Sequence, residues 1–318
     1  MVSSLPNGSG LEKGPSGGTR DWGGLYTSRV PSTRECAPRL RGQAGSRSVS
    51  PEGNTRMPMY SHSRLSVYER CPRQYRFRYV ERVKVPEVET VEMFLGSRVH
   101  DALETLYRRV KGGAVPTLDD LLADYRARWQ AEWTGTIHIS KPERTAEDYL
   151  ALGVRHLATY HARYQPFDQE RTLDVERRIA FPLDETRRIW LRGYIDRLSI
   201  TRDRIWQIRD YKSGQWLPSQ ADVDADRQLA LYQIGIERRF RGHPRRVELV
   251  WHYLAHDVEL RSRREPEALR ALESDTLGLI DTIQADKTWE IVVGPHCRRC
   301  SYQALCPAWS AQLELPGV

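Results

Sequence analysis

The chain has 318 residues, of which 39% are hydrophobic and 29% are charged, an ordinary profile for a globular protein with a proper core. No apolar run reaches the roughly 18 residues that a membrane span needs, and no apolar segment follows a basic start as in a secretory signal. We therefore expect a cytoplasmic protein with no membrane partner. A reducing compartment and five cysteines, an odd number, argue against a disulfide framework. The net charge of +7 favours an anionic partner such as nucleic acid, although a compositional bias toward Arg explains it as well.

The first part of the chain, residues 1–56, differs in composition from the rest. It contains ten Gly, nine Ser and five Pro, shows no hydrophobic periodicity and carries +4 of the net charge. Such a segment cannot bury enough apolar surface to fold, so we predict a disordered low-complexity tail. Met57 and Met59 are plausible true starts, and Cys36 receives no role. The predicted domain then covers 57–310, and 311–318 form a second short tail.

Helices are predicted for the next part of the chain. Ser63 suits the N-cap of a helix over 64–70, and Pro72 suits the first position of another helix that reaches about residue 82. Apolar residues at helical spacing then predict a third helix over 94–111, which Gly112-Gly113 ends. Two further helical stretches are expected at 117–133 and 145–164. We interpret 112–165 as a helical insertion.

Strands follow the helices. Alternating and β-branched segments predict strands over Leu173–Phe181, Arg188–Leu198 and Arg204–Lys212, and a hairpin formed by Val247–Leu254 and Val258–Ser262. Helices are expected over 222–240 and 266–286. Three consecutive strands, a crossover helix and a further strand predict an α/β core, with the preceding helices as a cap on it.

A carboxylate–lysine pattern closes one of these strands. In Asp210-Tyr211-Lys212, side-chain alternation places Asp210 and Lys212 on one face, while Tyr211 points away and leaves its carbonyl free as a ligand. Asp196 lies near the end of the neighbouring strand. Two such carboxylates can hold Mg²⁺ or Mn²⁺, which polarise a phosphate and lower the pKa of bound water. Lys212 would orient that water or offset charge in the transition state. The alternative is a solvated ion pair on a strand.

Five short patterns follow one another along the chain. They are Ser63–Tyr75, Leu95–Glu104, Gly193-x-x-Asp196, Asp210-x-Lys212 and Gln228-x-x-x-Tyr232. Together they resemble the ordered motif set of RecB-type nucleases in the PD-(D/E)XK superfamily, over about 60–307. The resemblance implies a restriction-endonuclease-like core, in which helices flank a mixed central sheet, with an N-terminal helical cap.

The resemblance also implies roles for single residues. The ligands of Mg²⁺ or Mn²⁺ would be His100, Asp196 and Asp210. Lys212 would be catalytic, and Gln228 and Tyr232, which lie on one helix face, would support the site and contact the substrate. Glu176 matches an acidic position of some members and is a further catalytic candidate. Outside the resemblance, a surface histidine, core packing of Tyr232 and an exposed strand glutamate explain these residues as well.

Four cysteines form a second constellation. They are Cys71, Cys297, Cys300 and Cys306. Four thiolates can bind a [4Fe–4S] cluster or a zinc ion, and local spacing alone does not separate the two. One distant cysteine followed by C-x2-C-x5-C resembles the iron–sulfur nucleases of the Cas4, AddB and exonuclease V type, which implies a [4Fe–4S] cluster. It would join the two ends of the domain as a structural staple.

These patterns predict a metal-dependent deoxyribonuclease that hydrolyses phosphodiesters, as an exonuclease on single-stranded DNA ends, in repair or recombination. No phosphate-loop motif is present, so a helicase would be a separate subunit. Two alternatives stay open. One is a Cas4-like nuclease of CRISPR spacer acquisition, with an integrase subunit as partner. The other is a non-catalytic nucleic-acid-binding protein with a structural metal site.

Overall fold

The computed structural model describes residues 58–86, 88–240, 244 and 246–309. The predictions made for residues 1–56, for 311–318 and for Cys36 therefore lie outside the described residues. No helix in the described part of the chain is long and apolar enough to cross a membrane.

One mixed sheet is the centre of the fold. Its strands are β1 (Met59–Tyr60), β2 (Glu170–Asp184), β3 (Ile189–Thr201), β4 (Trp206–Lys212), β5 (Val247–Tyr253) and β6 (Val258–Ser262). β2 pairs with β3 along a long antiparallel ribbon, and β3 also pairs with β1 and β4. β4 and β5 are parallel, and β6 closes an antiparallel hairpin with β5. The parallel pair requires a crossover, which the helices between β4 and β5 supply.

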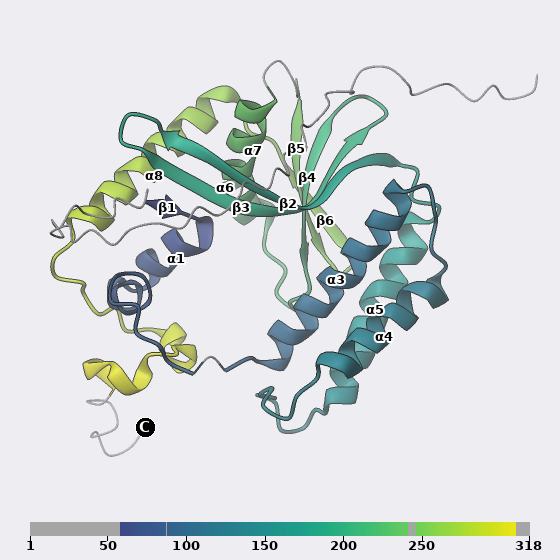
Figure 1. The fold of residues 1–318 in the computed structure, drawn as a ribbon, viewed down its shortest axis with the longest axis horizontal. Helices are drawn as coiled ribbons and strands as arrows, with labels where there is room; N and C mark the ends of the chain where they lie inside the picture. The colour runs from purple at the N-terminus through teal and green to yellow at the C-terminus, as the bar shows by residue number, and fades with distance from the viewer. Residues whose placement is uncertain (1–57, 87, 241–243, 245, 310–318) are drawn as a thin grey trace, which may run out of the picture. The chain divides into compact units, whose positions relative to one another are not determined.

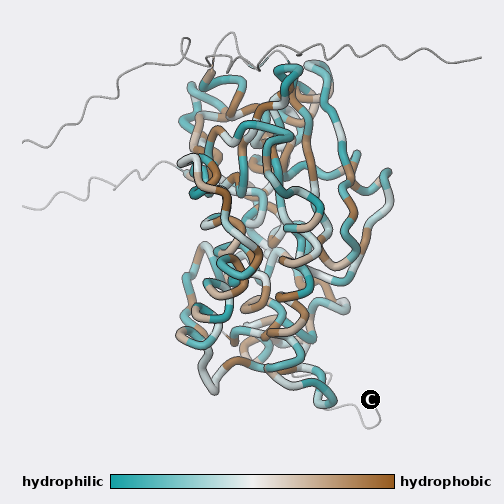
Figure 2. The backbone as a smooth tube through the Cα atoms, turned by 90° about the vertical axis from the view of Figure 1, so that its right-hand side faces the viewer, coloured by the Kyte–Doolittle hydropathy of each residue, from teal (hydrophilic) through white to brown (hydrophobic). Residues whose placement is uncertain are grey.

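Helices flank both faces of this sheet (Figure 1). They are α1 (His62–Arg70), α2 (Pro72–Tyr75), α3 (Val91–Lys111), α4 (Leu118–Glu132), α5 (Ala146–Tyr164), α6 (Gln220–Ala225), α7 (Gln228–Arg239) and α8 (Pro266–Ala285). α3, α4 and α5 pack together and share one apolar cluster with Val175 and Tyr211 of the sheet. α1, α7 and α8 share a second cluster with the other face. Figure 2 shows hydrophobic and hydrophilic stretches alternating along the helices, as expected for helices with one buried side.

Three local predictions were wrong. The expected helix over 222–240 is two helices, since Asp226 and Arg227 separate α6 from α7. The N-cap of α1 is Ser61, whose hydroxyl accepts from the Arg64 amide at 3.1 Å, so Ser63 lies inside the helix. The helix expected from Pro72 to about 82 is α2 followed by a π-helical turn, Arg76–Val80. Pro72 does occupy the first turn, as predicted.

At one point along the β2–β3 ribbon, the side of the sheet on which its apolar residues are buried changes. Val175 packs under α3–α5, whereas Ile195, on the partner strand, packs on the α7 side. Between them, Glu176 has a φ of 45°, the left-handed region that a non-glycine residue rarely adopts. The register Val175↔Arg197 and Arg177↔Ile195 brackets Glu176 and Asp196. These two acidic residues therefore lie opposite each other at the point where the buried side of the ribbon changes.

Candidate metal-binding active site

Asp196 lies where β3 and β4 separate. The paired residues of these strands end at Arg197↔Arg209, one step before Asp196. The backbone amide of Tyr211 donates instead to the Asp196 carboxylate at 2.8 Å. A side chain thus takes the place of a backbone acceptor, and it holds the carboxylate against the end of β4.

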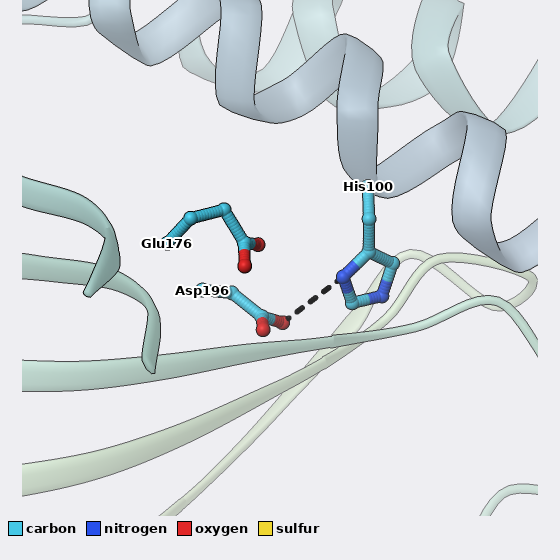
Figure 3. Close-up of side chains that lie close together, drawn as sticks. All are labelled: His100, Glu176 and Asp196. Atoms are coloured by element: carbon cyan, nitrogen blue, oxygen red, sulfur yellow. Dashed lines mark ion pairs between the residues drawn. The ribbon is translucent and has the colours of Figure 1, made fainter. Parts of the chain in front are cut away.

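His100 and Glu176 join Asp196 in one group (Figure 3). One ligand atom from each of the three residues lies within 4.8 Å of the other two. His100 projects from α3; its Nδ1 is 3.4 Å from Asp196 Oδ2, and its Nε2 donates to the Tyr211 carbonyl at 2.8 Å. The expectation that this carbonyl is free was therefore wrong, because the α3 histidine reaches it. α3, the β2–β3 hairpin and the end of β4 therefore meet at this point.

The electrostatics of the group fit a divalent cation. Burial and the neighbouring Asp210 charge raise the pKa of Asp196 to about 7, against an opposing effect of His100. Burial also raises the pKa of Glu176, and Glu104 and Asp101 add to the shift. Carboxylates that are crowded together without a cation hold protons more tightly, and a bound cation would reverse this. Carboxylate oxygens with one imidazole suit Mg²⁺ or Mn²⁺.

Asp210, Lys212 and Gln228 form an adjoining group. Lys212 Nζ lies 2.6 Å from Asp210 Oδ2, and the Gln228 amide donates to Asp210 Oδ1 at 2.9 Å. Lys212 also donates to the Gln228 oxygen at 3.2 Å. Burial alone would lower the pKa of Lys212, but the charges of Asp210, Asp196 and Asp226 outweigh it and raise that pKa. Asp210 and Lys212 share a face, as predicted. The side chain of Asp210 contacts Lys212 and Gln228, whereas Glu176 is the residue that lies with His100 and Asp196.

The ring of Tyr232 packs closely against Gly193 of β3, the strand that carries Asp196. A Cβ at Gly193 would lie 2.2 Å from the Tyr232 ring, so only glycine fits there. Burial and the Asp210 charge raise the pKa of Tyr232 to about 12, and its hydroxyl interacts with the side chain of Gln228. A phenol in this state keeps its proton at neutral pH and can donate to a phosphate oxygen.

Asp226 is a further residue of this group, and it was not predicted from the sequence. Its carboxylate accepts from the backbone amide of Gln228 at 2.7 Å, and its charge contributes to the raised pKa of Lys212. It stands two residues before Gln228, at the break between α6 and α7. A helix break next to the Gln-x-x-x-Tyr pattern was the available signal, and treating 222–240 as one helix concealed it.

The four cysteines line one pocket with Arg73 and Tyr302. Cys71 is the residue between α1 and α2. After α8, Cys297 lies in the 3-10 turn Pro295–Arg299, Cys300 directly follows that turn, and Cys306 directly follows the next one, Gln303–Leu305. Burial raises the pKa of the Cys300 thiol, and Cys71, Cys306 and Cys297 each add to that shift. The fold therefore brings the N-terminal cysteine close to the C-terminal three. Four thiols around one pocket are a donor set that suits an iron–sulfur cluster or zinc.

Comparison with known proteins places this site in a family. The profile described as the PD-(D/E)XK nuclease superfamily matches residues 59–307. The chain belongs to this superfamily, whose members are nucleases that use divalent metals. Among solved structures, the crystal structure of SSO0001 is similar at a TM-score of 0.38 and 13% identity, over 82% of this chain and 89% of that chain. No curated protein matches.

Proposed function

We propose that this protein is a Mg²⁺- or Mn²⁺-dependent deoxyribonuclease that acts as an exonuclease on single-stranded DNA ends in repair or recombination. The observation that carries the proposal is the group formed by His100, Glu176 and Asp196 directly beside the Asp210–Lys212 pair. Membership of the nuclease superfamily supports the reaction class. The choice of DNA, of single strands and of the biological role is our inference.

The residues divide the chemistry between them. His100, Glu176 and Asp196 would hold a divalent cation, which when bound would polarise the scissile phosphate and lower the pKa of the attacking water. Lys212, held beside Asp210 at 2.6 Å, offsets the negative charge that builds up on the phosphate oxygens in the transition state. Gln228 bridges Lys212 and Asp210 and so fixes the position of both.

We further propose that Cys71, Cys297, Cys300 and Cys306 hold a [4Fe–4S] cluster. Their convergence on one pocket supports a shared site for all four. Because the ligands come from both ends of the domain, binding would favour the folded chain and act as a staple. Zinc is the alternative occupant, and iron and zinc content of the purified protein separates the two.

Cleavage of a 5′-labelled single-stranded oligonucleotide tests the proposed reaction. The full-length protein should cleave it with Mg²⁺ or Mn²⁺, stop when EDTA is added and resume when Mn²⁺ is restored in excess. A folded protein that binds the strand without cleaving it under all these conditions would instead be a non-catalytic binding protein. The repair role predicts a separate helicase as partner, whereas co-purification with a CRISPR integrase would assign spacer acquisition.

A further inference from the structure

The β2–β3 ribbon has an open face that begins at the metal site. Beyond Glu176 and Asp196, the next cross-strand pair on this face is Arg178 opposite Tyr194, followed by Ala180 opposite Arg192. All four side chains are exposed, and Tyr194 is 55% exposed. The alternate residues of the same stretch, such as Ile179 and Ile195, are buried against α7 and its neighbours. The ribbon thus has one apolar side and one basic, aromatic side.

The two arginines on this open face are Arg178 and Arg192. Within the described ranges, neither Arg178 nor Arg192 makes a side-chain hydrogen bond or ion pair. On the covered face a few residues away, by contrast, Arg197 and Arg209 are buried and pair with Glu170. Unpaired, exposed guanidinium groups keep their full capacity to bind phosphate through two parallel hydrogen bonds.

The spacing along the ribbon fits an extended polynucleotide. Two residues of a strand span about 6.6 Å, so Arg178 and Tyr194 lie one such step, and Arg192 two steps, from the acidic pair at the metal site. Basic groups that alternate with an aromatic ring are the arrangement by which proteins follow a single strand, with phosphates on the cations and a base on the ring. A base within a duplex is already stacked on its neighbours, so the ring selects unpaired nucleotides.

We propose that this face is the track along which single-stranded nucleic acid reaches the active site, with Tyr194 stacking on an unpaired base and Arg178 and Arg192 binding phosphates. The inference rests on the proposed function and deepens it by naming the residues that select the substrate. Charge complementarity and the direct continuity of the face with Glu176 and Asp196 support it.

Binding of fluorescein-labelled oligo(dT) to the full-length protein, followed by anisotropy with Ca²⁺ in place of Mg²⁺, tests the track. Tyr194→Ala should weaken binding at least about fivefold, the lower limit for loss of one stacked base, and Tyr194→Phe should restore most of it. The double variant R178E/R192E should weaken binding at least about tenfold and reduce its salt dependence. The matched control is R126E/R155E, which removes two exposed arginines from α4 and α5 with the same change in net charge; neither forms an ion pair with another described residue.

Several outcomes would overturn the track. If R178E/R192E and R126E/R155E weaken binding equally, only overall charge matters. If Tyr194→Phe binds as poorly as Tyr194→Ala, stacking is not the interaction. Equal affinity of the wild type for a blunt duplex would show that unpaired bases are not selected. A wild-type protein that cleaves oligo(dT) with Mn²⁺ while all ribbon variants bind normally would refute the track alone. A wild type that neither binds nor cleaves would refute the proposed function itself.

Discussion

Glu170 connects the two strands that carry Asp196 and Asp210, and its substitution tests whether that connection stabilises the fold. One of its oxygens lies 2.5 Å from Arg209, the other 3.3 Å from Arg197, and the three side chains are at most 6% exposed. Arg197 and Arg209 are also direct cross-strand partners. The carboxylate therefore braces β2, β3 and β4 through Arg197 and Arg209, which are the chain neighbours of Asp196 and Asp210.

The expected cost of Glu170→Gln follows from burial. Burial alone would raise the pKa of Glu170, but the charges of Arg197 and Arg209 outweigh it and hold that pKa below its usual range. The group is thus ionised at pH 7, and its contribution is lost only as the pH falls through the lowered folded-state value. Removing one partner of a buried pair costs about 3–5 kcal/mol, because the remaining charges stay buried. At about 2–4 °C per kcal/mol, the melting temperature should fall by roughly 6–20 °C.

Urea unfolding followed by circular dichroism at pH 7 measures the effect. The control is Asp168→Asn, since Asp168 pairs with Arg202 at 3.3 Å but the two side chains are 64% and 74% exposed. An exposed pair contributes at most about 1 kcal/mol, so this variant should unfold nearly as the wild type does. Equal unfolding free energies for Glu170→Gln and Asp168→Asn would refute the brace.

Three further predictions concern other parts of the chain. Burial lowers the pKa of His156 from 6.5 to about 4, so the free energy of unfolding should fall by up to about 3 kcal/mol as the pH falls from 6.5 to 4. Urea unfolding at pH 7.5 and 4.5 should show this decrease in the wild type and not in His156→Leu. Cys71→Ala should lose iron and much of its soluble yield, whereas Cys36→Ala keeps both; full iron content in Cys71→Ala would refute the staple. Gly193→Ala should displace Tyr232 and reduce cleavage at least about tenfold without unfolding the protein, and wild-type kcat would contradict the close approach.

Periodicity predicted β2 to β6 and most helices because the relevant patterns are local, but it missed the short strand β1. Strand alternation correctly placed Asp210 and Lys212 on one face, since a regular strand transmits that pattern without further information. The convergence of His100 on the Tyr211 carbonyl depends on packing between segments 111 residues apart, which no local pattern contains.

Two other features could not be predicted for similar reasons. The change of buried side at Glu176 coincides with a φ of 45° at this residue, and a run of β-forming residues does not predict such a backbone conformation. An arginine in a strand usually indicates a solvent-facing position. Arg197 and Arg209 are nevertheless buried, because they form ion pairs with Glu170 and Glu259. Asp226 shows the opposite case, since a helix-breaking acidic residue beside Gln228 was visible in the sequence.

The most direct test of the account is the rate of metal-dependent cleavage by Asp196→Asn and Lys212→Ala, compared with the exposed Asp168→Asn. Cleavage of a labelled single strand is measured with saturating Mn²⁺, and circular dichroism checks that each variant is folded. Removing one electrostatic group from an active site typically costs about 10²–10³ in rate, so both site variants should fall at least that far while Asp168→Asn matches the wild type. Folded site variants that cleave at the wild-type rate would contradict the assignment of this site.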